Sequence, residues 1–315
     1  MSADKLKDII SRIRQEETRW DAILELKLIN DPEVVDQLLA LLGDRDWVVR
    51  WCVAEKLGDM GNPKAIYLLV KRLNDKDYHV RRTAAKALEK FGKVGIPGLV
   101  KQFNHSNADV RSQVFAILKH FGASAIPDLE EALVKVDWII ANRIVHTIWS
   151  IGGCLAEDAL IRSIYRPLAQ KNAIMMLSIM KSRKSIPYLL KAYDMLGLKR
   201  CVINAFKHMG AVGYPILIKY AITEDAKFTM QSRNIVVKIG EPMLKILVKA
   251  LTVKDYNKPI IIAMIQKIGP AKVIRYIISL AKQDKEIKSL TENMIAKYSR
   301  KPEKKQGGIL GLLGM

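Results

Sequence analysis

Polar and basic side chains recur at intervals of about 30 residues through the middle of this 315-residue chain. They are amides, imidazoles and cations at equivalent positions of successive segments: Asn142, Arg143, His146, Lys171, Asn172, Arg200, Asn204, His208, Gln231, Asn234 and Lys238. Such a row can donate many hydrogen bonds and attract negative charge, so it predicts a binding surface for an extended acidic ligand. The alternative is a set of solvated polar positions without a ligand.

Sequence motifs for catalysis are absent. The sequence has no Gly-x-x-x-x-Gly-Lys-Ser/Thr loop, no strand followed by Gly-x-Gly-x-x-Gly, and no Gly-x-Ser-x-Gly elbow. The five histidines have no second histidine at metal-ligand spacing, and Cys52, Cys154 and Cys201 lie far apart. We therefore expect no metal, no cofactor and no small-molecule substrate, and three reduced thiols in a cytoplasmic protein.

The charge is strongly asymmetric along the chain. Residues 1–150 carry 23 basic and 21 acidic side chains, whereas residues 151–315 carry 29 basic and 11 acidic ones. The basic half predicts an acidic protein partner, with nucleic acid as the alternative. A protein is favoured because Lys outnumbers Arg by 22 to 7 in this half, and Arg is the more usual contact for phosphate. A merely solubilising lysine-rich surface stays open.

The elements that position these side chains are repeats. Glycine recurs at nearly constant spacing at Gly61, Gly92, Gly122, Gly152, Gly210, Gly240 and Gly269, with Lys181 in the one skipped position. Within one unit, Val80, Ala84, Ala87, Leu88 and Phe91 follow the spacing of one helix face. Asp77 precedes that helix as an N-cap and Gly92 ends it. A second helix, with Pro in its first turn, precedes each such helix, so every repeat is a helical hairpin.

The motif Asp-x-x-Val-Arg-x-x-Ala-x-x-x-Leu-x-x-x-Gly, present as Asp46 to Gly61 and Asp77 to Gly92, resembles the HEAT-like repeat of phycobilisome lyases. The resemblance implies an all-α fold, an α-solenoid of about nine to ten hairpins, in which the second helices line the binding surface. It also implies that the arginines Arg50, Arg81 and Arg111 pair with Asp46 and Asp77 of neighbouring units. We expect a solenoid over residues 1–298: a degenerate N-terminal cap repeat (1–30), near-consensus repeats (31–152) and divergent basic repeats (153–298).

Three families of enzymes have similar repeats. Deoxyhypusine hydroxylases use similar repeats with His-Glu pairs that bind iron, and this chain has no such pair. A bilin lyase-type subunit is possible, although the repeat alone does not mark a lyase. Alkylpurine DNA glycosylases are loosely similar at Asp137, Trp138, Arg143 and Trp149, but Asp137 occupies the position of Asp46 and Asp77, which favours helix capping.

Aromatic residues and the C-terminal tail leave alternatives open. Trp47, Tyr78 and Trp138 lie three residues before the arginine position and predict either a stacking platform or packing of the inter-helix turn. Residues 299–315 are expected to be a flexible basic linker with an apolar end, formed by Ile309, Leu310, Leu312 and Leu313. That end would dock into a partner or cap the last repeat, and weak contact with a membrane surface is the further alternative.

Overall fold

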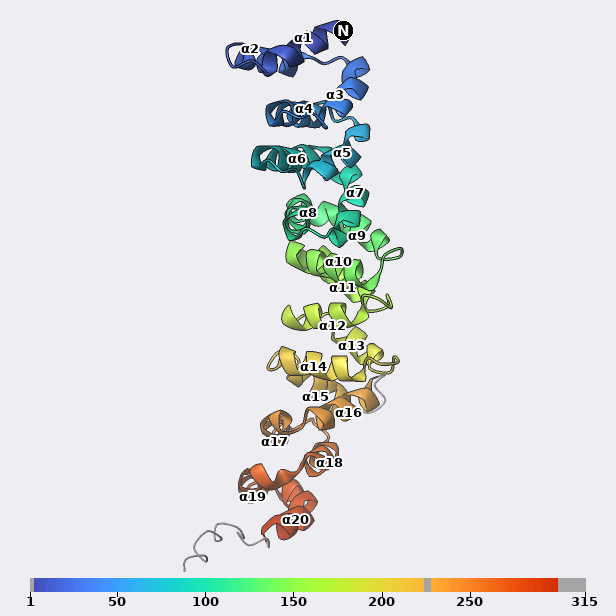
Figure 1. The fold of residues 1–315 in the computed structure, drawn as a ribbon. Coiled ribbons are helices and arrows are strands. Elements are labelled where there is room, and N and C mark those ends of the chain that lie inside the picture. The colour runs from blue at the N-terminus through green and yellow to red at the C-terminus, as the bar shows by residue number, and fades with distance from the viewer. Residues whose placement is uncertain (1–2, 224–227, 300–315) are drawn as a thin grey trace, which may run out of the picture. The chain divides into compact units, whose positions relative to one another are not determined.

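The computed structural model describes residues 3–223 and 228–299, and every regular element in these ranges is a helix (Figure 1). The helices α1 to α20 follow one another as ten consecutive pairs. The expected all-α, α-solenoid class is confirmed. The chain divides into two compact units, residues 1–176 and residues 177–315, which are called unit 1 and unit 2 below.

Unit 1 contains the first six pairs. Their first helices are α1 (Ala3–Ile13), α3 (Val35–Leu41), α5 (Ile66–Arg72), α7 (Ile96–Lys101), α9 (Ile126–Ala132) and α11 (Gly153–Ser163). Their second helices are α2 (Arg19–Leu28), α4 (Trp47–Met60), α6 (Tyr78–Phe91), α8 (Ala108–Phe121), α10 (Trp138–Ile151) and α12 (Gln170–Ile179), of which α12 ends beyond the unit boundary.

Unit 2 contains four further pairs. Their first helices are α13 (Ile186–Ala192), α15 (Tyr214–Ile222), α17 (Leu244–Ala250) and α19 (Ile274–Ala281). Their second helices are α14 (Lys199–Met209), α16 (Thr229–Ile239), α18 (Lys258–Ile268) and α20 (Lys285–Ser299). The sequence-based subdivision at residues 30, 152 and 298 stays a prediction. Ile309, Leu310, Leu312 and Leu313 lie outside the described residues.

The turns that end the second helices use left-handed backbone, as the glycine spacing predicts. All seven glycines of the repeat have positive φ, from 50° at Gly210 to 110° at Gly269. Lys181, which replaces glycine in the skipped position, has φ 53° and is the one non-glycine residue with positive φ in the described ranges. The turn geometry is therefore kept even where the side chain disfavours it.

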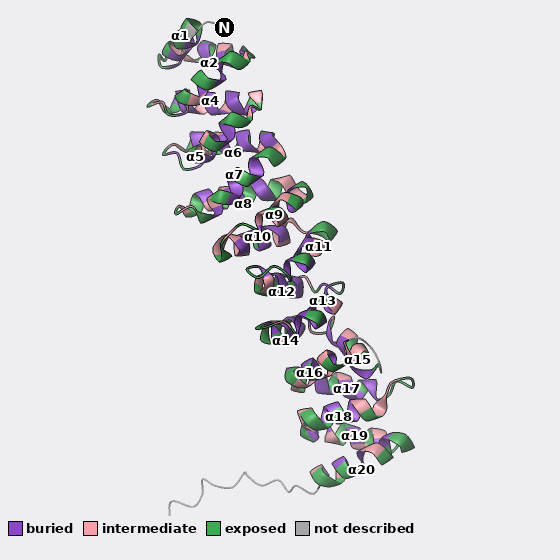
Figure 2. Cartoon of the chain, turned by 90° about the vertical axis from the view of Figure 1, so that its right-hand side faces the viewer, coloured by how far each residue is buried: buried purple, intermediate pink, exposed green. Residues whose placement is uncertain are grey.

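Helix capping and burial also follow the sequence pattern. The Asp77 carboxylate accepts hydrogen bonds from the backbone N–H groups of His79 and Val80, and the Asp137 carboxylate accepts one from that of Ile140. The predicted apolar face of α6 is buried. In each unit the buried residues line the sides of helices that meet their neighbours (Figure 2). Within each unit, a hairpin thus buries its apolar face against its neighbour, since it cannot do so alone.

Two helices of unit 1 approach unusually closely. A Cβ atom placed on Gly58 of α4 would lie 2.6 Å from the Cβ of Ala87 and 2.8 Å from its Cα on α6. Ordinary contacts between such atoms are longer, so only glycine fits at this crossing without a backbone shift. The equivalent positions on α8 and α10 carry Lys119 and Thr147, which are larger.

The expected pairing of the repeat arginines with Asp46 and Asp77 is wrong. Both aspartates cap helices, and Arg50 instead binds Asp75 of the following repeat, through Nε–Oδ2 at 2.9 Å and Nη2–Oδ1 at 2.7 Å. Arg81 and Arg111 have no ion pair within residues 3–223 and 228–299; each donates from Nη1 to two carbonyl oxygens of its own inter-helix turn. The N-cap position faces its own helix, so its carboxylate is already used.

Candidate functional site

The predicted row in unit 1 lies on α10 and α12 and borders a pocket. The pocket has a volume of about 580 Å³ and includes four residues of the row, Asn142, Arg143, His146 and Asn172. The remaining lining residues come mainly from α8 and the start of α10: Phe103, Ala108, Arg111, Ser112, Phe115, Trp138 and Ile139. Lys171, also of the row, is exposed outside the pocket. The structure therefore brings part of the predicted row together with apolar side chains.

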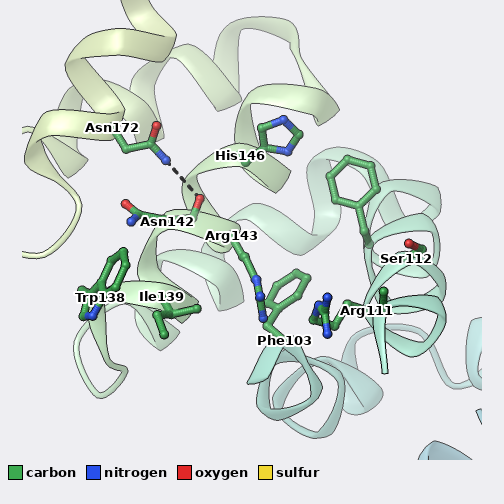
Figure 3. A pocket seen from close by; sticks show the side chains of 11 residues that line it. Phe103, Arg111, Ser112, Trp138, Ile139, Asn142, Arg143, His146 and Asn172 are labelled. Carbon is green, nitrogen blue, oxygen red and sulfur yellow. Dashed lines mark hydrogen bonds between the residues drawn. The ribbon is translucent and has the colours of Figure 1, made fainter. Parts of the chain in front are cut away.

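Two arginines meet at this pocket. Figure 3 shows Arg143 extending from α10 beside Phe103, with Arg111 of α8 also at the pocket wall. Burial lowers the pKa of Arg143, and the positive charge of Arg111 lowers it further, while Asp137 partly offsets both effects. In the part of the chain that the structure describes, neither guanidinium has an ion pair with a carboxylate, so two like charges share a partly desolvated site.

Other members of this part of the row also make contacts within the protein. The His146 ring lies 5.5 Å from the Phe115 ring and 5.2 Å from the Trp149 ring, measured between centroids. The Asn172 amide donates to the backbone carbonyl oxygen of Asn142 at 3.1 Å (Figure 3). Asn172 thus braces α12 against α10, whereas His146 is exposed at the pocket rim.

The row in unit 2 lies on α14 and α16. Gln231 is half-buried, and the other five side chains are exposed cations, imidazoles and amides: Arg200, Asn204, His208, Asn234 and Lys238. The Gln231 amide donates to the Asp194 carboxylate at 2.6 Å, so it is used within the unit. Arg200 and Lys238 have no ion pair among the described residues.

The aromatic residues before the arginine position are exposed, with 42% of Trp47, 56% of Tyr78 and 62% of Trp138 accessible to solvent. These rings are therefore not fully buried in the inter-helix turn, and both interpretations of them stay predictions. The Arg81 guanidinium lies 5.8 Å from the centre of the Tyr78 ring, and the Trp47 and His79 rings are 5.5 Å apart. On α6, a second helix of unit 1, an aromatic ring therefore lies beside a cation.

Sequence reasoning missed half of the pocket. Phe103, Phe115 and Ile139 are apolar residues of ordinary helical spacing, and nothing in their pattern separates them from core residues. A usable signal lies six residues before the arginine position, where successive repeats carry Asp44, Asp75, His105 and Lys135. The loss of the carboxylate along this series marks the arginines that lack an internal partner.

Metal-ligating side chains do not cluster in the described ranges, where no three His, Cys, Asp or Glu residues are grouped to hold an ion. Cys52 is buried, and burial raises the pKa of its thiol to about 12. No helix within 3–223 or 228–299 combines the length and apolarity needed to cross a bilayer.

Comparison with known proteins identifies the repeats. The family model of HEAT repeats matches residues 3–89. No curated protein sequence matches this chain. Among solved structures, the CpcE–CpcF complex of phycocyanin lyase from Nostoc sp. PCC7120 is 17% identical, with a TM-score of 0.31 and coverage of 74% of this chain and 94% of that one. Human deoxyhypusine hydroxylase in complex with glycerol is also 17% identical, with a TM-score of 0.31 and coverage of 75% and 96%.

An engineered protein, a structural-genomics target, is similar over 94% of this chain and 99% of its own, at 17% identity and a TM-score of 0.28. At these identities and scores the three likenesses give no information about what this chain binds or catalyses.

Proposed function

This chain is a HEAT-like repeat protein, and from that premise we propose that it is a scaffold whose second helices bind an acidic protein partner. The observation that carries the proposal is the set of exposed cations in the row that have no ion pair in the described ranges: Lys171 in unit 1 and Arg200 and Lys238 in unit 2. Some exposed cations elsewhere do find carboxylates, such as Lys64 with Asp36 at 3.1 Å and Arg162 with Glu130 at 2.7 Å. An acidic partner would supply what the row lacks.

Amide and imidazole side chains lie between these cations. They can form hydrogen bonds with the backbone of a polypeptide, which favours a protein partner. Asn204, His208 and Asn234 are exposed on the same helices as Arg200 and Lys238. Asn is a poor helix former, so its use in the middle of exposed helices favours a role in binding over a role in helix stability. Protein surfaces of this kind gain specificity from hydrogen bonds and association rate from charge.

The test is a charge reversal with a matched control. We expect Lys171→Glu, Arg200→Glu and Lys238→Glu together to reduce capture of copurifying partners from the native source by at least tenfold. Lys101→Glu, Lys219→Glu and Lys249→Glu reverse three exposed cations of first helices in the same two units and should leave capture unchanged. Equal capture by both triple variants would contradict the proposal, provided that thermal unfolding shows both to be folded.

Nucleic acid is distinguished by salt dependence. Binding through phosphates weakens by several powers of ten between about 50 mM and 200 mM salt. A steep loss of that kind with DNA or RNA, together with no capture of protein, would replace the acidic protein by a nucleic acid as the ligand.

A further inference from the structure

The pocket between α8, α10 and α12 has a composition that the rest of the row does not share. Its walls combine Phe103, Phe115, Trp138 and Ile139 with the guanidinium groups of Arg111 and Arg143. A purely solvated surface position would not be lined by so many apolar side chains, and a core position would not contain two unpaired cations. The pocket therefore favours a ligand that is apolar on one side and anionic on the other.

Unit 1 itself shows how an arginine in this position of the repeat binds a carboxylate. Arg50 donates from Nη1 to the carbonyl oxygens of Asp44 and Arg45 and from Nε and Nη2 to the two carboxylate oxygens of Asp75. Arg111 makes the same pair of carbonyl contacts, to His105 and Ser106. Lys135 stands at the sequence position of Asp75, and no carboxylate of residues 3–223 or 228–299 pairs with the bidentate face of Arg111.

Arg143 strengthens the attraction for an anion. It is half-buried, its guanidinium has no hydrogen bond to the described residues, and it shares the pocket with Arg111. The repulsion between the two guanidinium groups disfavours the empty pocket and is relieved when one negative charge lies between them. The free donors of Arg111 and the repulsion between the two guanidinium groups thus both favour an anion between Arg111 and Arg143.

A single carboxylate fits this place better than a polyanion. Besides the two arginines, the pocket is lined by Phe103, Ala108, Ser112, Phe115, Trp138, Ile139, Asn142, His146 and Asn172, none of which is Lys or Arg. A nucleic acid backbone needs a continuing series of cations. A volume of about 580 Å³ accommodates a few side chains of a peptide.

We propose that this pocket binds a short acidic-apolar peptide segment of a protein partner, with an Asp or Glu carboxylate between Arg111 and Arg143. The apolar or aromatic residue next to that acid packs against Phe103, Trp138 and Ile139. The inference rests on the proposed function, because it names the feature of the acidic partner that this part of the scaffold recognises.

The experiment uses the full chain and an array of nine-residue peptides in a Gly-Ser frame. Each peptide contains one Glu or Asp placed one to three residues from a Phe, Trp or Leu. We expect binding to a subset of these peptides, and at least a tenfold loss of affinity when the acid is replaced by Gln or Asn or the apolar residue by Ser. Binding to no peptide, or equal binding after the acid is replaced, would overturn the proposal.

The matching protein variants are Arg143→Gln, Arg111→Gln and, as a control on α8, Lys119→Gln. Arg143→Gln breaks no hydrogen bond within the described protein and relieves repulsion, so we expect an unchanged or higher melting temperature together with at least a tenfold loss of peptide affinity. Lys119 is exposed and does not line the pocket, so Lys119→Gln should bind normally. Peptide affinity that survives Arg143→Gln would also overturn the proposal.

Arg111→Gln removes contacts to the turn and is interpreted only if its melting temperature stays close to that of the wild type. A twelve-residue oligothymidine forms the competing arm: binding of the oligonucleotide in preference to every peptide, lost in Arg143→Gln, would assign the pocket to nucleic acid instead.

The two proposals fail in different ways. The triple variant Lys171→Glu, Arg200→Glu, Lys238→Glu leaves every pocket residue unchanged. If the triple variant loses partner capture but the pocket binds no peptide, only the peptide-binding proposal for the pocket is removed. If the pocket binds a peptide but the triple variant captures partners normally, the role proposed for the row is removed.

Discussion

Arg50 and Arg111 occupy the same position of the repeat, two repeats apart, and differ in what faces them. Arg50 is 3% exposed and holds Asp75, which is also buried. Arg111 makes the same contacts to its own turn, yet it faces Arg143 rather than an aspartate across the pocket. The comparison shows that one structural arginine becomes a candidate binding residue when the neighbouring repeat loses its counter-ion.

The helices are also packed more closely around Arg50 than around Arg111. Around Arg50, Gly58 and Ala87 let α4 and α6 approach until no further atom fits between them. Around Arg111, the equivalent positions carry Lys119 and Thr147, and the pocket opens between α8 and α10. Small residues and a buried ion pair thus close one interface, and their absence accompanies the opening of the other.

Removal of the Asp75 carboxylate should have the largest effect. Asp75→Ala leaves the buried guanidinium of Arg50 without its counter-ion, which costs about 3–5 kcal/mol for pairs of this kind. Denaturant unfolding measures the change. As a control, Asp137→Ala removes an N-cap hydrogen bond and an exposed carboxylate that interacts with Arg143, and it should cost about 1 kcal/mol. Similar losses in both variants would show that Arg50 and Asp75 contribute no more than a cap.

Adding a Cβ atom at Gly58, where α4 and α6 are in close contact, should have the next largest effect on stability. Gly58→Ala forces its new Cβ against the backbone of Ala87 and should destabilise unit 1 by about 1–3 kcal/mol. Gly43→Ala is the matched control, because its Cβ would meet only the Ala40 carbonyl oxygen at an ordinary 3.5 Å. Melting temperatures that fall equally in the two variants would contradict the role of the close contact.

Lowering the pH should have a smaller effect on stability, through the ion pair of Arg50 and Asp75. Burial raises the pKa of Asp75, but the hydrogen bonds from Arg50 and from the Asp77 amide, with the charges of Arg50 and Arg72, outweigh it and leave the pKa below its ordinary value. The unfolded chain therefore binds more protons than the folded one at low pH. The contribution is complete above about pH 4 and is lost as pH falls through the lower pKa of the folded state.

Unfolding of the wild type and of Asp75→Asn, measured from neutral pH downward, checks this sign. The difference in stability between the two should shrink as pH falls below about 4. A difference that is constant, or that grows in acid, would rule out Asp75 as the titrating group.

Giving Arg111 a counter-ion should have the smallest effect on stability and a large one on binding. Lys135→Asp places a carboxylate at the sequence position of Asp75 and should stabilise the fold by at most about 1 kcal/mol, because residue 135 is exposed. It should also compete with the peptide and weaken its binding at least tenfold. Lys135→Ala, which removes the lysine without adding a carboxylate, should bind as the wild type does.

The sequence predicted most of the local structure because each repeat specifies it within a few residues. Asp77 caps the helix that follows it, the apolar face of α6 is buried, and Lys181 was placed in a glycine position from spacing alone. These features depend on backbone geometry and on short-range contacts, which the motif encodes directly.

The partner of Arg50 and the pocket could not be predicted in the same way. The turns before α4 and α6 each contain two aspartates, and the motif does not tell which one faces the preceding repeat: Asp75 does so, while Asp77 caps. The pocket depends on which side chains of α8 and α10 meet across the interface. Phe115 and Ile139 have the spacing of core residues, and only the structure distinguishes them.

Lys181 has a consequence for how the protein comes apart under stress. A side chain in left-handed backbone costs roughly 1 kcal/mol relative to glycine, and this turn lies just after the boundary between residues 176 and 177. In an array of nearest-neighbour contacts, unfolding starts where the chain is locally least stable, so we expect the turn at Lys181 to open more readily than the glycine turns and Lys181→Gly to suppress that opening.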